Sequence, residues 1–162
     1  MVITAYRQER DEKTTECHIH SEETSICPLC SGALRCFGRR KRVMIQNDGG
    51  KQKLHIRRRK CQECGKIHHE LPDMLVPYKR YSVDSIEKII AGDTKEVVCE
   101  ESTIRRIRTW WDTCRLYFES IIASLREKYK VHFSANMAPR EMFRAAANAH
   151  LWPATRSVFL TV

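Results

Sequence analysis

The chain lacks any long apolar segment, and this absence limits the protein classes to which it can belong. Within its 162 residues, no stretch approaches the roughly 20 consecutive apolar residues of a membrane-spanning helix. The first 12 residues lack the apolar centre of a secretion signal, and the segment becomes charged by Arg7. We therefore expect a cytoplasmic protein with no membrane partner, in which cysteines stay reduced.

Recognisable catalytic motifs are also absent. There is no nucleotide-binding loop, no DDE-type carboxylate set and no Ser/His/Asp order, and we find no repeats. The "HHE" at 68–70 resembles parts of HNH-type nucleases, which carry their histidine pair on a ββα unit with further Asn and His ligands. Here Pro72 follows almost at once, and the next helical segment offers Ile86, Glu87 and Lys88 instead. We expect no enzymatic activity and no small-molecule substrate.

Positive charge is abundant and concentrated in one segment. The chain has 29 Lys and Arg against 20 Asp and Glu, a net charge of +9. Between Arg35 and Lys60 there are 11 basic residues and one acid, Asp48, which gives +10 in that segment and about −1 elsewhere. Such a concentration favours a phosphate-binding surface over a merely solvated face. The basic residues that we expect to contact nucleic acid here are Arg39, Arg40, Lys41, Arg42, Arg57, Arg58, Arg59 and Lys60.

Two CxxC pairs, "CPLC" at 27–30 and "CQEC" at 61–64, indicate a metal site. Each pair places two thiolates on one side of a tight turn, and two pairs bridged by a hairpin can surround one zinc ion tetrahedrally. The spacing predicts a structural zinc ribbon with one Zn²⁺ held by Cys27, Cys30, Cys61 and Cys64. Gly32 and Gly65 follow the pairs and suit the positive φ of such turns.

The remaining cysteines and the nearby histidines show weaker signs of metal binding. Cys36, Cys99 and Cys114 are interpreted as small apolar residues. A metal-binding role of Cys17, His18 and His20 stays open but is disfavoured. His68 and His69 could compete for the zinc, but hydrogen bonding of a ring N–H to a carbonyl or a knuckle sulfur is the favoured role.

Local patterns predict an α+β fold, with a small zinc-ribbon β-hairpin lobe before a mainly α-helical helix-turn-helix region containing one long helix. "NDGG" at 47–50 separates strand-like segments 40–46 and 51–59, in which Val43, Ile45, Leu54 and Ile56 alternate with polar residues. We divide the chain into a flexible lead-in (1–25), the zinc ribbon (26–72), a linker (73–81), the helix-turn-helix and long helix (82–130), and a C-terminal helix and tail (131–162), with the helix near 139–150.

The helical half shows capping and recognition signals. Ser82 and Gly92 suit the ends of a helix. A short helix carrying Val97 and Val98 is expected to turn near 100–101, with Ser102 capping the next helix. In that helix we expect four side chains to face DNA as in a recognition helix: Thr103, Arg105, Arg106 and Arg108. An ordinary basic amphipathic helix is the alternative.

Apolar residues in the long helix repeat at spacings of three and four, from Ile104 to Leu125. This pattern is typical either of a helix packed on its own domain or of a dimer seam. A homodimer through residues 104–125 is therefore one possible assembly.

A family resemblance supports the DNA-binding interpretation. A ribbon followed by a helix-turn-helix resembles the N-terminal DNA-binding part of bacterial insertion-sequence transposases. More closely, "CPLCSGALRCFGRRKRV", "IRRRKCQECGKIHHELPDMLVPYKRYS" and "LWPATRS" resemble an uncharacterised bacterial family of small transposase-like proteins. The resemblance implies the same four cysteine ligands, and it implies no catalytic domain, because too few residues follow Tyr129 for an RNase H-like fold.

The sequence is compatible with two functions. The first is a zinc-stabilised, sequence-specific binder of double-stranded DNA, transposon-associated or regulatory. The second is an adaptor that docks other proteins through the ribbon and the helical seam. Binding of single-stranded nucleic acid is disfavoured, because Phe37 is the only aromatic residue within the basic segment.

Overall fold

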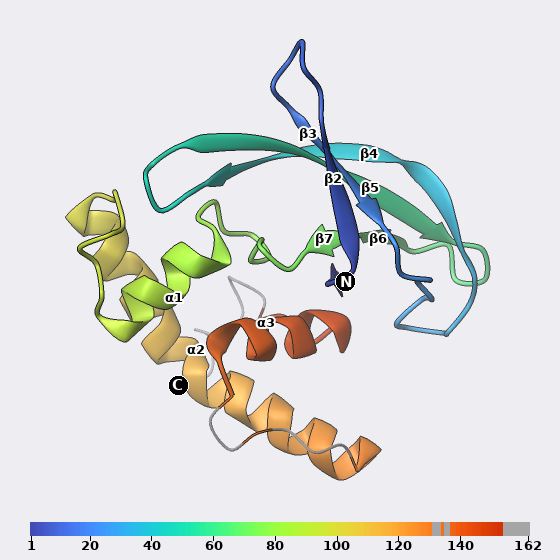
Figure 1. Cartoon of the computed structure of the whole chain (residues 1–162). Helices are drawn as coiled ribbons and strands as arrows, with labels where there is room; N and C mark the ends of the chain where they lie inside the picture. Colours follow the sequence, from blue (N-terminus) through green and yellow to red (C-terminus); the bar gives the residue numbers. More distant parts are fainter. Residues whose placement is uncertain (131–133, 135–136, 154–162) are drawn as a thin grey trace.

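The chain has the expected α+β architecture in a computed structural model that describes residues 1–130, 134 and 137–153. Figure 1 shows a curved sheet lying above a group of helices. The strands are β1 (Val2–Ile3), β2 (Tyr6–Arg10), β3 (Cys17–Ser21), β4 (Leu34–Ile45), β5 (Lys51–Cys61), β6 (Ile67–His69) and β7 (Leu71–Pro72), and the helices are α1 (Val83–Ala91), α2 (Glu101–Tyr129) and α3 (Pro139–Asn148).

The predicted hairpin is confirmed and is longer than expected. β4 and β5 pair antiparallel from Leu34 opposite Cys61 to Ile45 opposite Lys51. At the turn, the Gln46 N–H donates to the Gly50 carbonyl at 2.8 Å, and Gly49 takes the φ of 81° that this geometry requires. In Figure 1 the two strands form a ribbon that arches over β7 and α3.

One detail of the predicted alternation is wrong. Met44 lies in the core together with Leu54 and Ile56, whereas the predicted Val43 is exposed and the predicted Ile45 is only partly buried. The register places Arg42 opposite Leu54. Since directly opposed residues share a face and alternate residues share a side, Met44 joins the buried face and Val43 turns outward.

The expected flexible lead-in is instead part of the sheet, which corrects the prediction for residues 1–25. The main sheet has the order β2-β3-β5-β4, with β6 added beside β5, while β1 pairs with β7. Ile3 and Ile19 are buried in the core of the sheet. The segment's many charged residues hid a short alternation at Cys17 and Ile19, and the pairing partners lie far away in the sequence.

The linker connects two hydrophobic cores. Leu75 belongs to the core of the sheet, whereas the adjacent Val76 belongs to the helical core. α1 then begins as predicted, with the Ser82 hydroxyl accepting from the Ser85 N–H, and it is followed by Gly92 at a φ of 88°. α3 matches the predicted C-terminal helix, whereas residues 154–162 of the predicted tail lie outside the described part of the chain.

The apolar seam of α2 packs on its own chain. Ile104, Ile107, Cys114, Phe118 and Ile121 are buried in one cluster with residues of α1 and α3. The intramolecular alternative therefore accounts for the periodicity. None of the described helices combines the length and the apolar character that crossing a membrane requires.

The helix-turn-helix prediction needs correction in its details. No helix forms at Val97–Val98; nine residues, 92–100, connect α1 directly to α2. Val98 instead donates its N–H to the Asn47 carbonyl at the hairpin turn. α2 begins after Glu100, so Ser102 lies within the helix and is not its cap. The predicted first helix of the motif is therefore absent, and the connection between α1 and α2 is longer than the three- or four-residue turn that is typical of a helix-turn-helix.

Phe118 should dominate the stability of the helical half. It is fully buried and contacts the rings of Trp110, Trp111, Phe143 and Trp152. We expect Phe118→Ala to lower the free energy of unfolding by about 4 kcal/mol. The matched control is Leu116→Ala on the same helix, which is 69% exposed and should change it by less than about 0.5 kcal/mol. Urea unfolding measures both, and equal losses would contradict the packing described.

Candidate functional site

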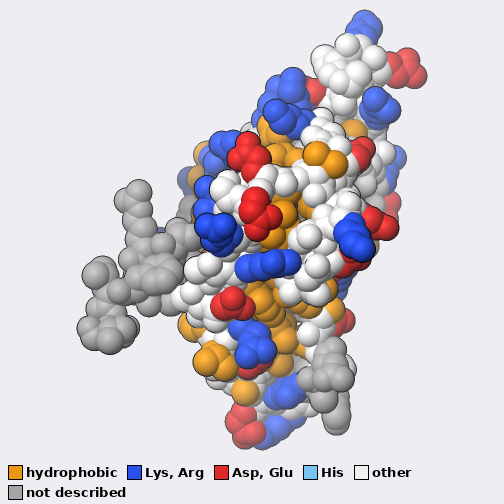
Figure 2. Space-filling model, turned by 90° about the vertical axis from the view of Figure 1, so that its left-hand side faces the viewer, with side chains coloured by type: hydrophobic (Ala, Val, Ile, Leu, Met, Phe, Trp, Pro, Cys, Tyr) orange, Lys and Arg blue, Asp and Glu red, His pale blue; other side chains and the backbone are white. Residues whose placement is uncertain are grey.

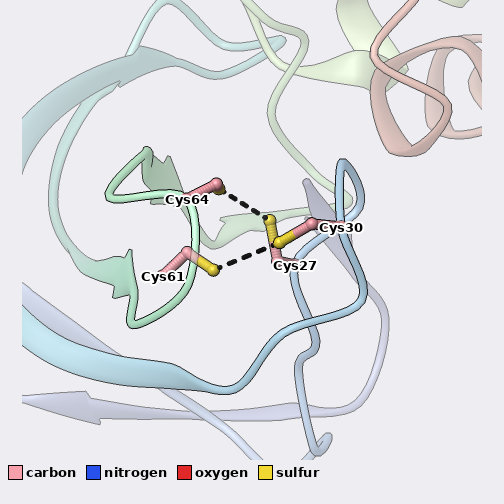
Figure 3. A group of neighbouring side chains, drawn as sticks. All are labelled: Cys27, Cys30, Cys61 and Cys64. Carbon is pink, nitrogen blue, oxygen red and sulfur yellow. Dashed lines mark hydrogen bonds between the residues drawn. The ribbon is translucent and has the colours of Figure 1, made fainter.

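The four predicted cysteines converge on one point, as Figure 3 shows. Their Sγ atoms all lie within 4.8 Å of one another. Sγ of Cys27 is 3.6 Å from that of Cys64, and Sγ of Cys30 is 3.5 Å from that of Cys61. A tetrahedral ion with metal–sulfur bonds of about 2.3 Å would separate its sulfurs by about 3.8 Å. The cluster can therefore hold a metal ion.

Backbone hydrogen bonds shape the two CxxC turns. In the first, the Ser31 N–H donates to the Cys27 carbonyl at 2.8 Å, and in the second the Cys61 N–H donates to the Lys66 carbonyl at 2.9 Å. Gly65 has the positive φ predicted for it, 69°, but in the first turn this conformation falls on Ser31, at 59°. Gly32 is required for space instead, because a Cβ there would lie 2.6 Å from Cγ of Glu63.

The thiols cannot all ionise without a cation. Burial opposes ionisation of Cys27, but the N–H groups of Leu29 and Cys30 and the neighbouring thiols lower its pKa to about 7. The Gly32 N–H favours the Cys30 thiolate, yet Cys61 and burial raise the pKa of Cys30 to about 12. Since one thiolate forms at the expense of its neighbours, a bound cation is what would stabilise all four.

His68 supports a cysteine rather than replacing it. Its Nε2 lies 3.4 Å from Sγ of Cys27, and its Nδ1 lies 3.3 Å from Nε2 of His150. If His68 donates to the sulfur, its Nδ1 accepts from His150, so both contacts are satisfied by neutral rings. The predicted hydrogen bond to a knuckle sulfur is confirmed for His68. His69 makes no hydrogen bond with a sulfur of the described residues, and both His68 and His69 line a neighbouring cleft.

Glu70 neutralises part of the basic segment, a role that the sequence analysis missed. Its carboxylate is 1% exposed and accepts from Nε of Arg57 at 2.6 Å and from the Ser25 hydroxyl at 2.9 Å. Nε of Arg59 lies 3.8 Å away. Arg57 therefore stabilises the fold through a buried ion pair, and Arg59 contributes more weakly at its longer distance.

A second carboxylate acts in the same way at the other end of the ribbon. Glu16 lies just before β3, 2.7 Å from Nζ of Lys41 and 3.6 Å from Nζ of Lys53. It also contacts Nε2 of His55 at 2.5 Å. The hydrogen bonds from His55 and Lys41 lower the pKa of Glu16 to about 2, so the group is ionised at neutral pH.

The register of the ribbon distributes the predicted nucleic-acid residues between two faces. Arg39 lies opposite Arg57, and Lys41 lies opposite His55, on the face where Glu16 and Glu70 neutralise charge. Arg40 lies opposite Ile56 and Arg42 opposite Leu54, on the face of the buried core. Arg58 and Lys60 share that face and lie over the Phe37 ring. The segment is thus one basic strip in sequence but two distinct surfaces in space.

On α2, most of the predicted recognition residues have structural contacts. Thr103 is buried, which corrects the expectation that it points outward, and its hydroxyl accepts from Arg106 at 3.1 Å. Nε of Arg108 donates to the Ile89 carbonyl at the end of α1. Arg105 is exposed and makes no side-chain hydrogen bond or ion pair with the described residues.

The remaining cysteines take no part in the cluster. Within the described residues, the four-cysteine group is the one candidate metal site found. Cys17 is buried and accepts from the Gln52 side chain, while His18 stacks on His55. Cys114 is buried as predicted, whereas Cys36 is exposed and Cys99 is partly exposed and outside any helix.

Comparison with known proteins identifies a family but no function. A family model described as a domain of unknown function, DUF6431, matches residues 27–107, half of the 162-residue chain. The chain therefore belongs to this family. The match begins at the first cysteine of the cluster and ends in the first turns of α2. No curated protein and no solved structure matches the chain.

The contact between His68 and Cys27 gives a test of the metal site. We expect His68→Ala to keep one metal ion per chain but to weaken metal affinity by about tenfold or more, because the sulfur loses its donor. His69→Ala is the control and should leave the affinity unchanged. Chelator competition measures affinity and elemental analysis measures stoichiometry. Loss of the ion in either variant would show that a histidine is a ligand.

Loss of the Glu70 charge should destabilise the fold far more than loss of an exposed carboxylate that is paired with an arginine. We expect Glu70→Gln to lower the free energy of unfolding by about 3 kcal/mol, because Arg57 and Arg59 are left without their counter-charge. Glu119→Gln is the control: its pair with Arg115 is exposed and should contribute about 0.5 kcal/mol or less. Urea unfolding at fixed metal concentration compares them. Similar losses in the two variants would contradict the role given to Glu70.

Proposed function

We propose that this member of the DUF6431 family binds double-stranded DNA, through a β-ribbon that is stabilised by one zinc ion. In this proposal the protein acts as a transposon-associated or regulatory factor. The resemblance to the DNA-binding part of insertion-sequence transposases is consistent with this proposal. The cytoplasm is the compartment in which such a role and reduced cysteines are compatible.

Zinc is the metal that the ligand set supports best. Four thiolates form a soft, tetrahedral donor set that suits Zn²⁺ and leaves no open position for water or substrate. Around the cluster, the buried core among the described residues comprises Cys27, Leu34 and Cys61, with Met1 packed against it. An ion bound here would therefore act structurally, by supplying folding free energy that the small core does not supply.

One observation carries the proposal: the exposed edge of the ribbon is basic. β4 is the edge strand of the main sheet, and every residue from Arg35 to Lys41 is exposed. Arg35, Arg39 and Arg40 are three of these seven residues, and a fourth basic residue, Lys41, is also exposed but is paired with Glu16. The major groove of B-DNA admits a two-stranded β-ribbon, and exposed arginines can contact its phosphates and base edges.

A different face of the molecule is a weaker candidate. Figure 2 shows the side on which α1 and the β4–β5 turn lie, and there Lys and Arg alternate with Asp and Glu around an apolar band. Such mixed charge gives little net attraction for a polyanion. We therefore assign the principal contact to the ribbon, with Arg105 as a flanking contact from α2.

An adaptor function remains the second candidate, because apolar side chains are exposed near the first CxxC turn. Ile26 and Leu29 are 58% and 53% exposed. Exposed apolar groups of this kind are common at protein-binding surfaces. Under this alternative, substituting both by Ser would abolish capture of a protein partner, and duplex DNA would not bind even at low salt.

Salt dependence tests DNA binding directly. The logarithm of the affinity for a duplex should fall linearly with the logarithm of salt concentration, because each neutralised phosphate releases counterions. Arg35→Gln should reduce the magnitude of this slope by about 0.9, since one phosphate contact is lost. Arg115→Gln, an exposed arginine on α2, should leave the slope unchanged. Fluorescence anisotropy measures both, and an affinity independent of salt would overturn the proposal.

A further inference from the structure

A cleft of about 420 Å³ opens beneath the ribbon, on the face opposite Glu16 and Glu70. It lies between β4, β6, the segment around Pro77 and the end of α3. Its lining includes Arg40, Arg42, His69, Tyr78, His150 and Trp152. Its volume lies within the range of small-molecule and cofactor sites, about 300–1,000 Å³.

The charge of the cleft has one sign. Among the described residues, none of those that line it is acidic, in contrast to the opposite face of the ribbon. Arg42 is held in place by donating to the Lys79 carbonyl at 3.0 Å, whereas the Arg40 guanidinium has no hydrogen bond or ion pair with any described residue. Burial, followed by the charges of Arg40 and Arg58, lowers the pKa of His69. The cleft therefore favours an anion.

Aromatic side chains from distant parts of the sequence form another part of the wall. Tyr78 and Trp152 both line the cleft. Tyr78 is 75% exposed, and its backbone is held at a φ of 61°, a conformation that is unfavourable for a bulky residue. The basic segment itself contains one aromatic residue, but folding brings Tyr78 and Trp152 beside its arginines, so rings for base stacking are present.

Two arginines beside two exposed or partly exposed rings match the chemistry of a nucleoside monophosphate. We propose that the cleft holds one unpaired nucleotide of bound DNA, with its phosphate between Arg40 and Arg42 and its base against Tyr78 and Trp152. This inference rests on the proposed DNA-binding function and names the feature of the DNA that is recognised. Stacking of one base on an aromatic side chain strengthens binding by about tenfold.

The test compares two DNAs with the full, zinc-loaded chain: a paired duplex, and the same duplex with one extra unpaired adenine. We expect the second to bind about tenfold more tightly. This preference should disappear in Arg40→Gln, which removes a phosphate contact, and in Tyr78→Ser, which removes a stacking ring. Arg39→Gln is the matched control, since it removes a neighbouring charge from the opposite face and should retain the preference.

Each other outcome counts against the inference in a distinct way. Equal binding of both DNAs overturns it and leaves the proposed function standing, whereas absence of binding to either DNA overturns both. An equal preference in all variants would also overturn it, because the cleft would then not be the recognition site. The nucleotide in the cleft could come from bound DNA or from free nucleotide in solution, and binding of deoxyadenosine monophosphate alone distinguishes these two sources. Its binding, lost in Arg40→Gln, together with equal binding of the two DNAs, would assign the cleft to free nucleotides and overturn the DNA source.

Discussion

Repulsion between like charges is the constraint on which the structure of the ribbon depends. Arg39 lies directly opposite Arg57, and Arg35 lies opposite Lys60, although such cross-strand pairs are destabilising. Three sets of contacts oppose this repulsion. Glu70 and Glu16 neutralise the charges of one face, and the four cysteines bring the two strands together at the open end of the hairpin.

This arrangement separates the residues that maintain the fold from those that remain available to a ligand. Basic side chains paired with buried or ionised carboxylates contribute to stability, and their charges are largely cancelled. Arg40 keeps its charge and has an open cleft beside it. The contact from Cys27 through His68 to His150 also links the four-cysteine cluster to the segment just after α3. The same cleft therefore has walls from the ribbon and from the helical half.

Local chemistry explains which features could be predicted from the sequence. The CxxC pairs, the turn at 47–50 and the caps Ser82 and Gly92 depend on residues close together in the chain, and these predictions are confirmed as structure. The strands β1 to β3, the buried ion pair of Glu70 and the aromatic wall of the cleft depend on contacts across many residues, and no local pattern indicated them. Glu70 follows two histidines in the sequence, and its partner Arg57 lies 13 residues away, so no local pattern pairs the two. The burial of Thr103 follows from its position four residues before the buried Ile107, on the same side of α2.

Closure of the ribbon by zinc is the central claim, and DNA affinity during zinc titration tests it most directly. The metal-stripped chain would receive zinc stepwise while binding of duplex DNA is followed at low salt. If the ion holds the open end of β4 and β5 together, affinity should rise with bound zinc and reach its maximum at one ion per chain. Full affinity in the absence of metal would contradict the account, because the basic edge would then be formed without the thiolate cluster.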